Sequence, residues 1–88
     1  MYNYLVEFIA TLFFMYVILA TGNPLAIGAA LALIMLVAGK FSGGYVNPAV
    51  SIAMVSAGKL NVNDLVPYIV AQILGALTAL QVYKRVQV

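Results

Sequence analysis

The sequence predicts an all-α integral membrane protein with three transmembrane helices and one re-entrant half-helix. Its 88 residues are 66% hydrophobic and 7% charged, with a mean hydropathy of +1.12. A soluble domain of this length cannot hide so much apolar surface from water. Between its apolar runs lies "SGGYVNPAVSIAMVSAGK", residues 42–59, a glycine-rich turn followed by a helical pattern too short to cross a bilayer. We expect one membrane domain over residues 1–88.

Two apolar runs predict the first two transmembrane helices. The run at 4–20 would extend about 26 Å, close to the hydrocarbon thickness of a bilayer, which is about 30 Å. The run at 25–39 would extend roughly 22 Å, which suffices if Lys40 directs its ammonium group toward the membrane surface. The turn "TGNP" separates the two runs, and Pro24 suits the first position of the second helix.

The segment 41–57 predicts a loop and then a half-helix. Its helical part, from Asn47 to Ala57, would cover about 16 Å, which is half a bilayer. Gly58 is expected to cap its end. Irregular backbone is not stable against lipid, so we expect the loop at 41–46 to be buried against protein or to line a water-filled cavity.

The third transmembrane helix is predicted at 65–83, and Asp64 is expected to cap its first turn. Ala71, Gly75 and Ala79 recur at every fourth position, a spacing that lets helix backbones approach closely. Tyrosines near the ends of the predicted spans are expected to be interfacial anchors; these are Tyr2, Tyr4, Tyr68 and Tyr83.

The loop and half-helix carry a family resemblance. "SGGYVNPAVSIA", with Asn47, Pro48 and Ala49, resembles the first Asn-Pro-Ala motif of the aquaporin and glycerol-facilitator family, the major intrinsic proteins. "VEFIAT", with Glu7, resembles the opening helix of that family, and "VPYIVAQILGA", with Gln72, resembles its third helix. The resemblance covers nearly the whole chain. It implies a passive transmembrane channel for water and/or small neutral solutes, not an enzyme.

The physical chemistry of the motif agrees with this resemblance. The side-chain oxygen of Asn47 can cap the half-helix and leave its amide N–H groups free for a solute, while Pro48 needs no N–H at its position. The partial positive charge of the helix N-terminus would orient water oxygens and repel cations. Gly43 and Gly44 would let the carbonyls of residues 43–45, Tyr45 included, turn into the pore as acceptors.

Two polar side chains within the spans are predicted to support the loop. The resemblance implies that Glu7 accepts hydrogen bonds from the loop, and we expect Gln72 to bond helix to helix. Two other interpretations of Glu7 stay open: an acid at the membrane interface, or a proton-coupled carboxylate as in small antiparallel drug exporters.

Several functions are excluded by composition. The chain has no His and no Cys, one Asp and one Glu, so we expect no metal site, no cofactor and no catalytic group. A net charge of +2 spread over six charged residues does not suit a nucleic-acid surface.

The resemblance also suggests a constriction of unusual chemistry. Where the second motif of the family is followed by an arginine, the single motif here is followed by Val50. In an antiparallel dimer the constriction would be built from Ile27 of both chains, Gly44 and Val50. Such a ring is apolar and uncharged, so passage of neutral solutes is expected.

A partner is expected because the family combines two inverted halves and this sequence has one Asn-Pro-Ala motif. Half a barrel would leave polar backbone open to lipid. Lys40 and Lys59 are expected on one side of the bilayer and Lys84 and Arg85 on the other, which gives no preferred orientation. We therefore predict an antiparallel homodimer, with assembly of four such dimers as a further step, in the cell (inner) membrane.

Two alternatives to the homodimer stay open. The partner could be a second-half homologue, which would make the chain one subunit of a heteromeric aquaporin-like channel. The chain could also be a non-conducting holin-like or scaffold membrane protein.

Overall fold

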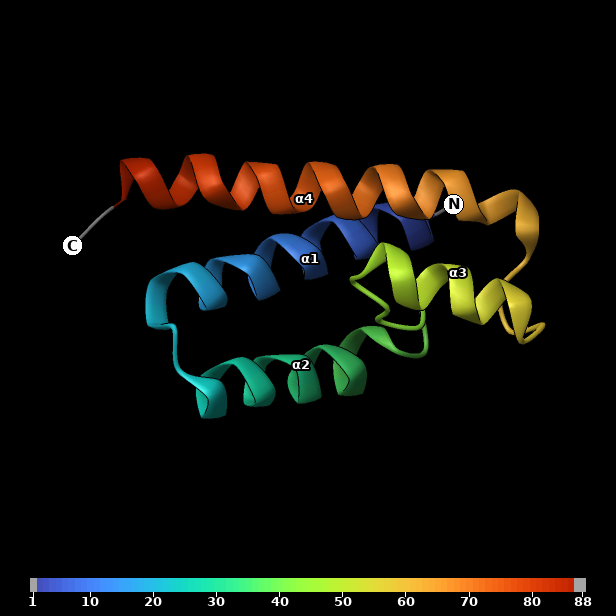
Figure 1. Cartoon of the computed structure of the whole chain (residues 1–88), viewed down its shortest axis with the longest axis horizontal. Coiled ribbons are helices and arrows are strands. Elements are labelled where there is room, and N and C mark those ends of the chain that lie inside the picture. The colour runs from blue at the N-terminus through green and yellow to red at the C-terminus, as the bar shows by residue number, and fades with distance from the viewer. Residues whose placement is uncertain (1, 87–88) are drawn as a thin grey trace.

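All regular elements of the computed structural model, which describes residues 2–86, are helices (Figure 1). They are α1 (Tyr2–Thr21), α2 (Pro24–Ala38), α3 (Pro48–Ser56), the short 3-10 helix η1 (Val62–Asp64) and α4 (Leu65–Arg85). Two helical segments, α1 and Val62–Arg85, are long and apolar enough to cross a membrane, and α2 is a shorter apolar helix. The protein is a helical membrane protein.

Local interactions fix where α2 begins and where α3 ends. Asn23 accepts hydrogen bonds from the backbone N–H groups of Leu25 and Ala26 at 2.9 and 3.1 Å, so α2 begins at Pro24. At the end of α3, Gly58 adopts a φ of 76°, a conformation that glycine reaches without a steric cost. The next residue, Lys59, donates its N–H to the Met54 carbonyl at 2.8 Å and closes the helix.

The start of α4 differs from the prediction. Asp64 makes no side-chain cap, because its φ of −90° and ψ of −9° already place it in the helical region, whereas a cap requires extended backbone. Instead Asn61 caps η1 by accepting from the N–H of Asn63 at 2.8 Å. The Asp64 carboxylate accepts a hydrogen bond from the Tyr4 hydroxyl at 2.6 Å, which ties the start of α4 to the start of α1.

Helices α1 and α4 run parallel and side by side (Figure 1). The rings of Tyr4 and Tyr68 meet edge to face at 5.9 Å near one end, and those of Tyr16 and Tyr83 meet at 6.3 Å near the other. Between these contacts a Cβ on Gly75 would lie 2.5 Å from the carbonyl oxygen of Phe8. The absence of a side chain at Gly75 therefore lets the backbones of α1 and α4 come close together.

Helix α2 returns antiparallel to α1, and α3 occupies part of the remaining side (Figure 1). The nine residues of α3 extend about 14 Å. It begins midway along the bundle, where the buried Ser51 meets Gln72 of α4, and it ends near the start of α4. Helix α2 runs toward the same end of the bundle as α3 but stops short of it (Figure 1). Lys40 and Lys59 therefore both follow elements directed toward that end, while α4 carries Lys84 and Arg85 to the opposite end.

Candidate functional site

The carboxylate of Glu7 lies fully buried at the centre of the bundle and accepts four hydrogen bonds. The Ser42 hydroxyl and the Tyr45 N–H donate to Oε2 at 2.6 and 3.1 Å, and the Val46 N–H donates to Oε1 at 2.9 Å. The fourth donor is the Gln72 amide, at 2.8 Å from Oε1. Both carboxylate oxygens therefore act as acceptors. Glu7 thus fixes the loop at 41–46 to α1.

Gln72 connects three elements. Its Nε2 donates to Glu7 of α1 and, at 2.7 Å, to the Ser51 hydroxyl of α3. The Ser51 hydroxyl then donates to the carbonyl of Asn47 at 3.1 Å. This chain of bonds runs from α1 through α4 to the first residues of α3, so it fixes the depth and direction at which α3 begins.

Tyr68 holds the other side of the loop, and its predicted place at the membrane interface is wrong. Its side chain is 1% exposed, and its hydroxyl donates to the Ser42 carbonyl at 2.8 Å. The tilted ring of Tyr45 lies 5.9 Å from the Tyr68 ring. A buried tyrosine hydroxyl needs a partner, and the loop backbone supplies it.

The loop has three positions with a positive φ. Gly43 and Gly44 have φ values of 94° and 64°, and a Cβ on Gly43 would meet the Tyr45 ring at 2.5 Å. Val46 has a φ of 48° although it is β-branched, a conformation that costs of order 1–3 kcal/mol. Its N–H bond to Glu7 and the burial of its side chain in a cluster with Ala10, Ile34 and Ala38 hold it there.

The turn at Gly43–Tyr45 leaves its carbonyls unbonded. Within residues 2–86, no protein donor is hydrogen-bonded to the carbonyl oxygens of Gly43, Gly44 or Tyr45. Three successive acceptors without a protein partner need water, a solute or another chain.

The tip of α3, which we define as Asn47, Pro48 and Ala49, begins two residues after the last of these carbonyls. The Asn47 Oδ1 accepts from the Ala49 N–H at 2.8 Å, and Pro48 takes the first helical position. Asn47 is exposed, as are Ala49 and Val50. The Asn47 oxygen is therefore used for capping, and its amide N–H groups are available on the surface of the chain.

The three residues predicted to form a constriction are not together in one chain. Gly44 is buried against Ile34 in the second half of α2, and Val50 is exposed on α3. Ile27 is half-buried near the beginning of α2, about 10 Å along the helix axis from Ile34. A ring that contains all three requires a second chain or a second half.

Ser42, Ser51 and Tyr68 are site residues that the sequence analysis missed. Tyr68 and Gln72 are four positions apart, and Gly75 and Ala79 continue the same face of α4. This shared helix face was the sequence signal that could have predicted a buried Tyr68. As for metals, no group of three or more potential His, Cys, Asp or Glu ligands occurs among the described residues.

Comparison with known proteins places this site in a family context. The family model described as "Major intrinsic protein" matches residues 22–88. Glycerol uptake facilitator protein-like 6 of Lactiplantibacillus plantarum is 40% identical over 88 residues, which cover 90% of this chain and 41% of that protein. Aquaporin Z of Brucella melitensis is 47% identical over 58 residues, 66% of this chain and 25% of that protein. Aquaporin-4 of Mus musculus is 38% identical over 89 residues, 81% of this chain and 27% of that protein.

The chain thus spans between about a quarter and two fifths of the length of these curated relatives. The matched residues 22–88 include the loop, all of α3 and all of α4. On this evidence the chain belongs to the major intrinsic protein family.

Proposed function

We propose that the chain forms half of a passive transmembrane channel for water and/or small neutral solutes. In this proposal α1, α2 and α4 are the transmembrane helices, and α3 is a re-entrant half-helix. The observation that carries it is the run of unbonded carbonyls at Gly43–Tyr45, which is separated by one residue from the exposed amide of Asn47. Unpaired acceptors that lie close in the chain to free donors suit a chain of water molecules or hydroxyl groups.

Electrostatics at the tip favour neutral solutes. The N-terminus of α3 carries about half a positive charge, and Gln72 and Ser51 hold its first turn midway along the bundle. The exposed Val50 adds no charge. A solute passing this point meets hydrogen-bond donors and a positive potential, which repel cations and protons.

The four donors around Glu7 argue against a proton-coupled carrier. A carboxylate that cycles between protonation states needs access to solvent in at least one state, whereas Glu7 is fully buried and bonded on both oxygens. Its proposed role is to keep the loop in place against the strain at Val46.

A second, inverted half is part of the proposal. The polar atoms at the tip lie on the surface of the chain, where contact with lipid would cost several kcal/mol per unpaired group. Another half that faces the tip would enclose a hydrated path between the two. Balanced charge, with Lys40 and Lys59 opposed to Lys84 and Arg85, supports a second copy in the opposite orientation.

Water permeability of proteoliposomes that contain only this chain tests the proposed function. Asn47→Asp keeps a capping oxygen but replaces the amide donor by a negative charge, so we expect permeability to fall to that of protein-free vesicles. Asn63→Asp makes the same substitution at an exposed position before α4 and should leave permeability unchanged. Equal permeability of the Asn47→Asp variant and the parent would contradict the proposal.

A folded parent chain that does not raise permeability would favour the other candidates. These are a subunit that requires a second-half homologue, or a non-conducting holin-like or scaffold protein. Addition of a second-half homologue would separate them, since only the subunit would then conduct.

A further inference from the structure

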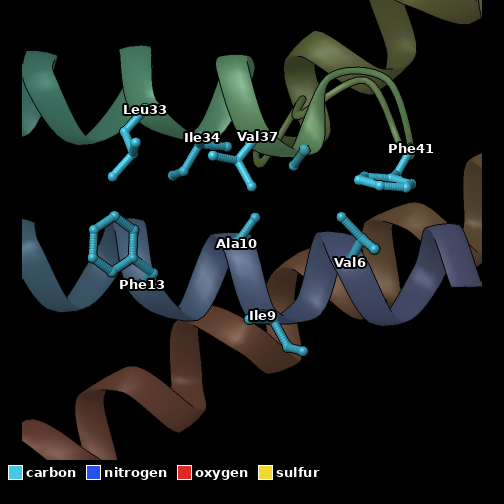
Figure 2. A pocket seen from close by; sticks show the side chains of 9 residues that line it. Val6, Ile9, Ala10, Phe13, Leu33, Ile34, Val37 and Phe41 are labelled. Atoms are coloured by element: carbon cyan, nitrogen blue, oxygen red, sulfur yellow. The ribbon is translucent and has the colours of Figure 1, made fainter.

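An apolar groove lies between α1 and α2 (Figure 2). Its volume is about 400 Å³, and no polar surface lines it. Val6 and Phe13 line it on α1, and Leu33, Val37 and Phe41 line the other wall. Phe13, Leu33, Val37 and Phe41 are all exposed, so the groove is open on the outside of the bundle.

A lysine stands at one end of this groove. Phe41 forms that end, beside Val6 (Figure 2), and the Lys40 ammonium lies 5.5 Å from the centre of the Phe41 ring. The chain contains two acids, and both are bonded elsewhere: Glu7 in the loop network and Asp64 to Tyr4. Among residues 2–86, the Lys40 ammonium therefore has no carboxylate partner.

We propose that the groove and Lys40 together bind an anionic glycerophospholipid, with an acyl chain in the groove and the phosphate against the Lys40 ammonium. The groove extends about 10 Å along α1, from Val6 to Phe13, and apolar walls suit methylene groups. Packing in lipid brings little hydrophobic gain, so the charge decides which lipid binds. This site is independent of channel activity.

Charge also distinguishes a lipid from a second copy of the chain. An inverted copy would bring Lys84 and Arg85 to the side of the membrane on which Lys40 lies, and a parallel copy would bring Lys40 and Lys59. The inverted copy would add two positive charges there, and the parallel copy would add two lysines and one acid, Asp64, so both arrangements add net positive charge. An anionic phosphate is the complementary partner.

Quenching of a single tryptophan by brominated lipids tests the proposal, because the chain has no Trp. Phe41→Trp places the reporter in the groove and keeps an aromatic ring beside Lys40. Val70→Trp is the matched control, since Val70 is exposed on α4 at the level of the Glu7 network. Both proteins are reconstituted at equal mole fractions of brominated phosphatidylglycerol or brominated phosphatidylcholine.

We expect the groove reporter to favour phosphatidylglycerol about fivefold in relative association constant and the α4 reporter to show no preference. Lys40→Gln should remove the preference, and Lys59→Gln, a change of another exposed lysine, should keep it. Millimolar inorganic phosphate should not compete.

Three results would overturn the proposal. The first is an absence of preference at the groove reporter, or a preference that survives Lys40→Gln. The second is loss of the preference with free phosphate, which would assign Lys40 to a soluble anion. The third is weak quenching of the groove reporter by both lipids together with cross-linking between groove positions of two chains, which would assign the groove to a second copy.

Discussion

At the scale of single residues, Ser42 does two things for the loop. Its hydroxyl donates to Glu7 at 2.6 Å and accepts from the Gly44 N–H at 3.3 Å, in a position that is 4% exposed. Ser42→Ala would leave a buried N–H without a partner and remove a bond to a carboxylate. We expect it to lower the free energy of unfolding by about 2 kcal/mol.

Ser56→Ala is the matched control for this change. The Ser56 hydroxyl is exposed and bonds back to the Ile52 carbonyl of its own helix, an interaction that adds little stability. We expect a change within about 0.5 kcal/mol of zero. Unfolding of both variants in the same detergent measures the difference, and similar losses would contradict the role assigned to Ser42.

The sequence allowed some residue roles to be anticipated and hid others. An acid within an apolar run, Glu7, must find donors or reach water, so its position alone predicted a special environment. Tyr68 was ambiguous, because a tyrosine near a helix end suits both the membrane interface and a buried loop contact. The face of α4 that packs on the loop is set by tertiary structure. Tyr68 lies on that face, so its hydroxyl bonds the loop backbone.

At the scale of elements, the close approach of α1 and α4 depends on Gly75. A Cβ there would lie 2.5 Å from the Phe8 carbonyl oxygen and 3.2 Å from the Leu12 nitrogen, both of them backbone atoms that cannot turn aside. Gly75→Ala should push the helices apart and lower the free energy of unfolding by about 1–3 kcal/mol.

Gly28→Ala provides the contrast. A Cβ on Gly28 meets no atom within 4 Å, so the better helix propensity of alanine should keep stability equal to the parent or raise it by up to about 1 kcal/mol. Thermal unfolding of the two variants side by side measures this. A larger loss for Gly28→Ala than for Gly75→Ala would mean that the packing of α1 on α4 is misassigned.

Element types were accessible from the sequence because apolar runs and capping residues are local signals. Pro24 and Gly58 mark helix ends through their own backbone preferences, and the structure places α2 from Pro24 to Ala38 and α3 from Pro48 to Ser56. Asp64 shows the limit of such reasoning. Its capping role was lost because η1 already gives it helical backbone and because Tyr4, sixty positions away, takes its carboxylate.

At the scale of the whole molecule, the proposed inverted pair requires chains in both orientations. Thr21, the last residue of α1, and Asn63 of η1 are exposed at opposite ends of the bundle (Figure 1). Single cysteines at these positions can be labelled with a membrane-impermeant reagent because the chain has no native Cys. We expect each to be about half labelled from one side. Strictly one-sided labelling would exclude the homodimer and favour a second-half partner.

A shift in the balance of basic residues tests whether that balance causes the chain to insert in both orientations. Replacement of Lys84 and Arg85 by Gln leaves Lys40 and Lys59 as the remaining basic residues. The end of the bundle that carries Lys40 and Lys59 should then be cytoplasmic in most chains. An unchanged distribution would show that orientation is set by something other than these four charges.

The proposal rests on a hydrated tip of α3 at mid-depth in the bilayer, and deuterium modulation of a spin label in heavy water measures that hydration directly. Labels at Val50→Cys and Ile73→Cys are matched in depth, since the adjacent residues Ser51 and Gln72 are hydrogen-bonded to each other. We predict strong deuterium modulation at position 50 and weak modulation at position 73, which is exposed on α4. Equally weak modulation at both positions would show that α3 faces lipid, and it would contradict the channel.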